Sequence, residues 1–458
     1  MLRVGLASLT ALVTLALGAC AGSPPAEAPV QPQLSTAEAA VLTDGQLQNI
    51  AAFRTGFFER DKSYSNAARA QATDRLAKLE QQAGKVSQAA FELELARIVA
   101  LSDNGHTHYN LGSIMQGRYR APIRLAVFGE DFYVVRATAP NQDLLGAKLV
   151  AVDGHQIAEL REAGRSLWGG TAAWRDRAAY NLLESPELLN ALGLARTTDR
   201  AEYVFATATG PVKRTLVGDP PSEARPFSGP PQTISPTPIP LEGATWRTAL
   251  DPAKAPWSLQ DWGKAFRWRS APEINGIVLD MRTTNNADMK IADALKMFSD
   301  AIDAQKPTNI VLDMRLNSGG NLLTARQFAR TLPERVPGRV FVLTGPGTFS
   351  AAISTTGYLK QAAPDRVFIT GEPVGDRMMF WAESPPFKLP VGLGSVSMAT
   401  ERHDYADGCR AYSDCHRNVK LVPIALPTLA PDIAAPWTID AYLAGRDPAM
   451  EAVVAALH

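Results

Sequence analysis

One serine in this sequence stands where a nucleophile for acyl transfer is expected. Ser350 follows the apolar run Val340–Leu343 and opens the alanine-rich segment Ala351–Lys360. The apolar run predicts a buried strand, and the alanine-rich segment predicts a helix. Ser350 would then lie at a helix N-terminus, where the helix dipole stabilises negative charge that develops on a substrate oxygen.

A glycine pair offers the second feature that acyl transfer needs. Gly319 and Gly320 come shortly after Ile310–Met314, an apolar run that predicts another buried strand. Glycine N–H groups can approach a substrate closely and donate hydrogen bonds to an oxyanion. A glycine pair alone is typical of a plain turn, but both features occur here in order, each at the end of a predicted strand.

Two histidines are candidates for the base that such a serine requires. His106 and His108 follow the turn sequence Ser102–Gly105, just past the end of a predicted helix. Histidine is the side chain best suited to accept a serine proton at neutral pH. The alternative is a pair of exposed turn histidines without a catalytic role.

The composition predicts a soluble globular protein with more than one domain. The chain has 458 residues, with 46 basic (Lys+Arg) and 46 acidic (Asp+Glu) side chains, so no overall field favours nucleic acid. The sequence contains no phosphate-binding loop, dinucleotide fingerprint or paired metal-binding motif. We therefore expect no cofactor and no metal.

The N-terminus predicts export and lipidation. Arg3 and the apolar run Val4–Leu17 are typical of a signal peptide, and the run is too short to span a bilayer. Leu-Gly-Ala-Cys, ending at Cys20, resembles the lipobox of bacterial lipoproteins. That resemblance implies a signal peptide over residues 1–19, a lipid anchor on Cys20 and, since Ala21 follows, an outer-membrane location facing the periplasm. An ordinary secretory signal with an incidental cysteine is the alternative.

The remaining cysteines, Cys409 and Cys415, lie in a polar loop with five residues between them. In an oxidising compartment this spacing favours a disulfide. A zinc site with His403 or His416 is the alternative, although the spacing fits no common zinc pattern.

The pattern along the chain predicts several domains. Residues 144–157 resemble part of a PDZ domain, a fold that binds peptide ends by strand addition. The predicted divisions are a flexible tether (20–35), a helical domain (36–112), a PDZ-like domain (113–210), a Pro-rich linker (211–275) and a core (276–458).

The core resembles the tail-specific and tricorn-core serine peptidases, in their histidine-using branch. The matching motifs are Asp103–Thr107, Asn309–Gly320, Thr348–Ala352, Val367–Gly375, Pro431–Ile433 and Gly445–Pro448. The resemblance implies an α/β fold, with a ClpP/crotonase-like core of β-β-α units, an N-terminal helical bundle and a PDZ-like segment.

The resemblance also implies roles for individual residues. Ser350 attacks a carbonyl, and the N–H groups of Gly319 or Gly320 and of Ala351 hold the oxyanion. His106 is the base, with His108 in reserve.

The other branch of the family uses a lysine, but Asp376 occupies that position here, and Lys360 is expected to be a solvated surface residue. Glu401 is the expected carboxylate that orients the histidine. Asp404, Asp407 and Glu372 remain alternatives.

The sequence thus predicts a lipid-anchored serine peptidase that cleaves polypeptides outside the cytoplasm. One alternative is a binding protein that kept the fold and lost catalysis, because Gly105 replaces the serine that precedes the histidine in the family. Another is an esterase or amidase, in which Met378–Trp381 would line an apolar pocket rather than form a core strand. A homo-oligomer is left open.

Overall fold

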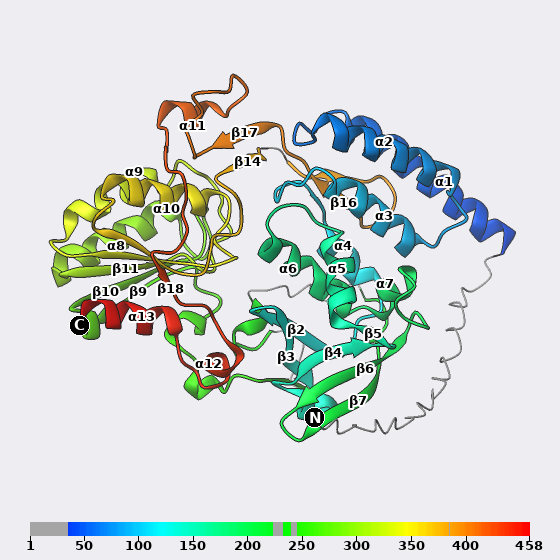
Figure 1. Ribbon diagram of the computed structural model, residues 1–458, viewed down its shortest axis with the longest axis horizontal. Coiled ribbons are helices and arrows are strands. Elements are labelled where there is room, and N and C mark those ends of the chain that lie inside the picture. The colour runs from blue at the N-terminus through cyan, green and yellow to red at the C-terminus, as the bar shows by residue number, and fades with distance from the viewer. Residues whose placement is uncertain (1–34, 223–231, 240–244, 384) are drawn as a thin grey trace, which may run out of the picture.

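The computed structural model describes residues 35–222, 232–239, 245–383 and 385–458. Figure 1 shows an N-terminal helical lobe, a PDZ-like lobe and an α/β core. The predicted signal peptide, Cys20 and the tether up to residue 34 lie outside the described residues. Within the described ranges, no helix is both long and apolar enough to cross a membrane.

The N-terminal lobe contains α1 (Thr36–Phe53), α2 (Asn66–Gln81) and α3 (Gln88–Ala100), in agreement with the spacing of its apolar residues. Each helix follows a serine whose hydroxyl accepts a backbone N–H bond from the first turn: Ser35, Ser65 and Ser87. Such caps satisfy donors that the first turn leaves unpaired. Most of α3 is buried, so the loop after it, which carries His106, starts from a fixed base.

The PDZ-like lobe is built on an antiparallel sheet with the strand order β2-β3-β4-β6-β7. Its strands are β2 (Ile123–Phe128), β3 (Asp131–Thr138), β4 (Lys148–Val152), β5 (His155–Gln156), β6 (Arg200–Thr207), β7 (Gly210–Val217) and β8 (Trp246–Thr248). Its helices are α5 (Ile157–Arg165), α6 (Ala172–Leu183) and α7 (Pro186–Ala191).

The predicted Pro-rich linker over 211–275 is wrong at both ends. Strand β7 lies within the PDZ-like sheet, and β8 pairs with β3 of the same sheet. At the other end, β9 (Phe266–Ala271) forms the antiparallel edge of the core sheet. The prolines in this region hid the strands because proline disfavours regular sheet.

The core is a mostly parallel sheet with the order β18-β13-β12-β11-β10-β9. Its parallel strands are β10 (Gly276–Met281), β11 (Asn309–Asp313), β12 (Val340–Thr344), β13 (Val367–Gly371) and β18 (Ile433–Ala434). The helices are α8 (Ile291–Gln305), α9 (Arg326–Thr331), α10 (Ala351–Ala362), α12 (Ile439–Leu443) and α13 (Pro448–Leu457). Helices α8, α9 and α10 cover one face and α13 the other, which is why the strands are apolar throughout.

An arm of the core reaches the N-terminal lobe. The arm contains β14 (Met379–Ala382), β15 (Phe387–Lys388), β16 (Ser395–Ser397) and β17 (Glu401–Asp404), followed by α11 (Arg417–Leu421). Strand β16 pairs with β1 (His108–Tyr109), and β14 pairs with β17. The strand that follows His106 is therefore completed by residues from near the other end of the chain.

Asn49 fastens this arm to α1. Its side chain donates to the carbonyl of Val391 and accepts from the Val391 N–H, at 3.0 Å each. We expect Asn49→Ala to lower the free energy of unfolding by about 1–3 kcal/mol, because two hydrogen bonds are lost at a buried site. Denaturant unfolding measures this, with the exposed neighbour Gln48→Ala as the control. Equal losses in both variants would contradict a fastening role for Asn49.

Candidate active site

Ser350 lies at the turn between β12 and α10, at the carboxyl edge of the core sheet. Its backbone has φ 56° and ψ −125°, a conformation that costs a non-glycine residue about 1–3 kcal/mol. Ser350 is the N-cap of α10, but its hydroxyl makes no capping hydrogen bond. The turn therefore presents an uncommitted hydroxyl, as a nucleophile requires.

The predicted glycine pair lies directly against this serine. A Cβ on Gly319 would approach the Ser350 Cβ to 2.6 Å, and one on Gly320 would approach the side chain of Asn285 to 2.6 Å. Both glycines also have positive φ, 103° and 133°. Only glycine satisfies the space and the backbone conformation together at these positions.

The N–H groups of this turn are not equivalent. Gly319 donates its N–H to the Asn317 Oδ1 at 2.8 Å, so that donor is already committed. Among the described residues, no hydrogen bond uses the N–H of Gly320 or of Ala351. The donor set that remains for an oxyanion is therefore Gly320 with Ala351, and Gly319 serves to shape the turn.

His106 approaches the nucleophile from the N-terminal lobe. Its ring stacks between Phe349, at a centroid distance of 4.3 Å, and Phe380 of β14, at 4.7 Å. Phe349 directly precedes Ser350, so the His106 ring packs on the residue next to this serine. Neither ring nitrogen of His106 makes a hydrogen bond within the described part of the chain. In unliganded enzymes, catalytic hydrogen bonds are often long or poorly aligned.

The loop that carries His106 is held from two sides. The Asn104 side chain donates to the Trp381 carbonyl at 2.9 Å and accepts from its N–H at 3.0 Å. The indole N–H groups of Trp168 and Trp174 both donate to the Gly105 carbonyl, at 3.3 and 3.2 Å. Trp381 belongs to the arm of the core and the other two tryptophans to the PDZ-like lobe, so the position of the histidine depends on both lobes.

Asp376 is the carboxylate that faces His106. Its Oδ2 lies 3.3 Å from the His106 Nδ1, and its side chain is 2% exposed. The Arg377 N–H donates to the other carboxylate oxygen at 2.8 Å and holds the group in place. An acid in this position fixes the imidazole tautomer and stabilises the imidazolium ion.

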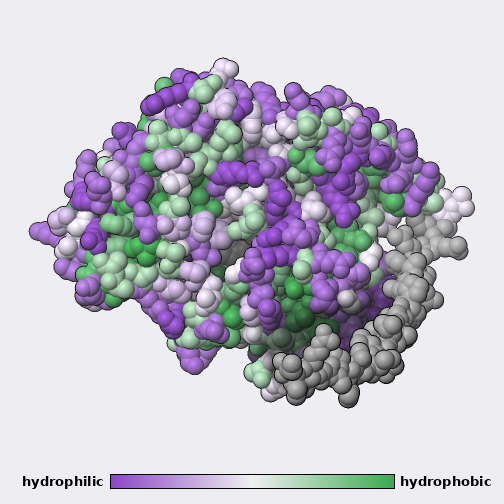
Figure 2. Space-filling model, viewed as in Figure 1, coloured by the Kyte–Doolittle hydropathy of each residue, from purple (hydrophilic) through white to green (hydrophobic). Residues whose placement is uncertain are grey.

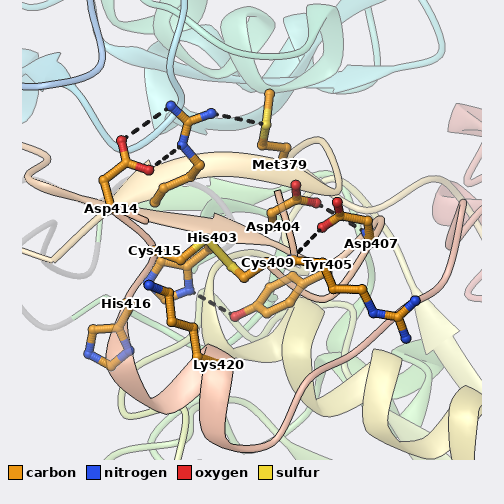
Figure 3. Close-up of a disulfide and its surroundings, with 12 residues drawn as sticks. Met379, His403, Asp404, Tyr405, Asp407, Cys409, Asp414, Cys415, His416 and Lys420 are labelled. Carbon is orange, nitrogen blue, oxygen red and sulfur yellow. Dashed lines mark hydrogen bonds and ion pairs between the residues drawn. A yellow bond between two sulfur atoms is a disulfide. The ribbon is translucent and has the colours of Figure 1, made fainter. Parts of the chain in front are cut away.

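The expectation that Glu401 orients the histidine is therefore corrected. Glu401 begins β17, is partly exposed and points its Oε2 toward His416, at 3.9 Å. In Figure 3, Asp404 at the end of β17 and Asp407 in the turn after it point away from His403 and His416. The Asp404 Oδ1 accepts the Ala406 N–H at 2.9 Å, and the Asp407 Oδ1 accepts the Arg410 N–H at 3.2 Å. Sequence reasoning noted Asp376 only as the residue that replaces a lysine. The tight turn at Gly375 was the available signal that this side chain returns to the site.

The predicted disulfide between Cys409 and Cys415 is present, with their Cα atoms 6.1 Å apart. It closes the loop beside His403, whose Nδ1 lies 2.9 Å from the Tyr405 hydroxyl (Figure 3). The His403 ring stacks on Phe380 at 5.1 Å, so this loop supports the aromatic stack behind His106. No group of three potential metal ligands occurs in the described ranges.

Lys360 is not the solvated residue that the sequence suggested. Its ammonium group donates to the Val367 carbonyl at 2.8 Å and pairs with Asp432 at 3.1 Å. The lysine thus ties α10 to the segment before β18, and these contacts occupy its ammonium group.

Most of Met378–Trp381 forms a strand, the simpler of the two roles considered for it. Met379–Ala382 form β14, in which Phe380 is buried against His106. Met379 is 43% exposed. The segment is therefore a strand that positions the histidine, rather than the wall of a pocket.

His108, the reserve base, lies outside the site. Its ring stacks on Trp168, and its Nε2 lies 3.3 Å from the Ser397 hydroxyl. Burial lowers its pKa from 6.5 to about 4. This histidine supports the β1–β16 pairing and would be neutral in the folded protein near neutral pH.

We expect His108 to make stability sensitive to acid. Because its pKa is about 4 in the folded protein and near 6.5 when unfolded, the unfolded chain binds the proton first as pH falls. The contribution is complete above the unfolded value and is lost as pH falls toward the folded one. The melting temperature of the wild type should fall more steeply across this window than that of His108→Gln. Parallel curves for the two proteins would contradict this assignment.

Solved structures with a similar fold are known, although no sequence comparison finds a match. No family model matches the sequence, and no curated protein matches it. The crystal structure of mature CPAF superposes with a TM-score of 0.52 at 13% identity, covering 91% of this chain and 97% of that chain. The photosystem II D1 C-terminal processing protease covers 88% of this chain and 98% of its own, at 15% identity and a TM-score of 0.38.

The α/β fold expected from the sequence is confirmed by the superposition with mature CPAF. At this identity the match shows a shared fold alone.

Proposed function

We propose that this chain is a serine peptidase that uses Ser350, His106 and Asp376. The observation that carries the proposal is the convergence of the three on one edge of the sheet. Ser350 lies in a strained turn and its hydroxyl makes no capping hydrogen bond. His106 stacks on the residue before Ser350, and the Asp376 Oδ2 lies 3.3 Å from the His106 Nδ1. A shared fold alone would not require this arrangement.

The proposed reaction follows from these positions. The Ser350 hydroxyl transfers its proton to the His106 Nε2 as its oxygen bonds to the carbonyl carbon of the substrate. The N–H groups of Gly320 and Ala351 stabilise the resulting oxyanion. His106 then donates the proton to the leaving amine, and water releases the acyl group by the reverse sequence.

We further propose that the enzyme acts outside the cytoplasm on polypeptides, anchored to the outer membrane through a lipid on Cys20. The disulfide between Cys409 and Cys415 supports this location, since such bonds persist in oxidising compartments. The PDZ-like sheet supports a polypeptide substrate, because PDZ domains bind extended chains.

A second candidate function is ligand binding without catalysis. The observation that favours it is that no hydrogen bond joins His106 to Ser350 in the described residues. An esterase or amidase would use the same groups on another acyl substrate.

Labelling with a fluorophosphonate probe tests whether the serine is activated. We expect the wild-type protein to react and Ser350→Ala to be inert. His106→Ala should react slower by about two to four orders of magnitude, because general base catalysis contributes that much. Circular dichroism on each variant controls for folding. A folded wild type that resists labelling would support the binding protein instead.

Matched substitutions can show whether Asp376 or Glu401 orients the histidine. Asp376→Asn should reduce kcat/KM for a peptide substrate by about three to four orders of magnitude, because the imidazole loses the acid that fixes its tautomer. Glu401→Gln should change it by less than about threefold, since Glu401 faces His416. The reverse order of effects would restore Glu401 as the orienting carboxylate.

A further inference from the structure

A cavity of about 210 Å³ lies between the PDZ-like lobe and the core. The PDZ-like lobe contributes Ala126–Gly129 at the end of β2 and, from one face of α6, Ala173 and Tyr180. The core contributes Leu316 and Trp437. The walls are thus largely apolar, and Figure 2 shows apolar residues gathering near the lower centre, where these lobes adjoin.

This cavity is continuous with the nucleophile turn. Its floor includes Gly345–Gly347, the residues that lead from β12 to Ser350. The Thr348 hydroxyl accepts the Gly345 N–H at 3.1 Å and donates to the Met314 carbonyl at 2.9 Å, which fixes that turn. In sheets of this kind, ligands bind at the carboxyl ends of the parallel strands, where both the cavity and Ser350 lie. A group in the cavity would therefore contact the turn that leads to Ser350.

Near the start of β2, a backbone N–H and an arginine guanidinium are placed where they could bind an anion, but a glutamate of the protein already accepts their hydrogen bonds. The Leu125 N–H donates to the Glu184 Oε1 at 2.8 Å. The other oxygen of Glu184 accepts from Arg120 at 2.9 and 2.6 Å. Glu184 caps the end of α6 and is 1% exposed. The backbone donor and guanidinium that would receive a chain terminus are therefore occupied.

The described lining residues of the cavity offer no free charge partner for a carboxylate. Arg315, the cation among its lining residues, pairs with Asp313 at 2.6 Å and with Asp447 at 2.8 Å. Asp176 pairs with two arginines, and burial raises the pKa of the Glu372 carboxyl. A free carboxylate would meet only acids and committed pairs there, whereas an apolar side chain would be desolvated favourably.

We propose that this cavity binds an apolar side chain from within an extended polypeptide substrate, and that the PDZ-like lobe does not select a free C-terminal carboxylate. Strand β2 lies at the edge of its sheet, and Glu184 occupies only the Leu125 N–H, so a substrate strand can lie beside Ala126–Phe128 with one side chain in the cavity. The inference rests on the proposed function, since it names the substrate class of the same site. It replaces the expectation that the lobe recruits peptide ends.

Peptide binding to the Ser350→Ala protein tests this without turnover. The probes are a fluorescein-labelled peptide with central leucines, made as the free acid and as the C-terminal amide, and the same peptide with aspartates in place of the leucines. Fluorescence polarisation gives Kd. We expect acid and amide to bind within about twofold of each other and the aspartate peptide to bind at least about tenfold more weakly.

Two substitutions on α6 locate the contact. Ala173 is exposed at the cavity, so Ala173→Trp should fill the cavity and raise Kd for both leucine peptides by at least about tenfold. Ala172→Trp is the matched control, because Ala172 is also exposed but does not line the cavity. The Kd of the leucine peptides for the Ala172→Trp variant should equal their Kd for the Ser350→Ala protein without it.

Several outcomes would overturn the inference. One is that the free-acid peptide binds tenfold more tightly than the amide. Another is that Ala173→Trp and Ala172→Trp change Kd equally. The third is that neither leucine peptide binds. Fluorophosphonate labelling of the protein with Ser350 intact separates this failure from that of the proposed function. A labelled enzyme without cavity-dependent binding contradicts only the inference, whereas cavity-dependent binding without labelling contradicts only the peptidase.

Discussion

The packing of His106 between two aromatic rings is the contact on which the rest of the site depends. Phe349 comes from the nucleophile turn and Phe380 from the arm, and each buried ring pair contributes about 0.5–1.5 kcal/mol beyond its area. The stack extends to Trp174 on one side, 3.8 Å from Phe349, and to His403 on the other. The plane of the imidazole is thus set by packing, while its nitrogens stay available for protons.

This arrangement distributes one site over three lobes. The core supplies Ser350, the glycine turn and Asp376, whereas His106, the proposed base, comes from the loop after α3. Trp168, which follows α5, and Trp174, in the first turn of α6, donate to the Gly105 carbonyl next to it. Thr171 also donates to the Gly375 carbonyl at 2.9 Å, beside Asp376. A displacement of the PDZ-like lobe would therefore shift His106 and Asp376 together.

The apolar runs and turn residues of the sequence were enough to predict those parts of the site that a single strand and its following turn position. The strands before Gly319 and Ser350 are apolar runs buried on both faces, and the turn chemistry after them is unambiguous, so those elements follow from sequence. His106 was found because its residue type suits the role. Asp376 was not assigned to it, because which acid meets the ring depends on how two distant loops pack. The PDZ-like boundary was misplaced for a related reason, since β8 joins its sheet across a proline-rich stretch.

The pairing of β1 with β16 has a consequence for biosynthesis. His108 and Tyr109 find their strand partners only at Ser397 and Val396. A chain made from its N-terminus carries the histidine loop without its strand partner until nearly nine-tenths of its length has emerged, and contacts so distant in sequence form slowly. The full set of contacts around the His106 loop can therefore form only after residue 397 has been made. A partly synthesised chain would hold Ser350 without a fixed His106, so the proposed reaction could begin only once the arm is complete.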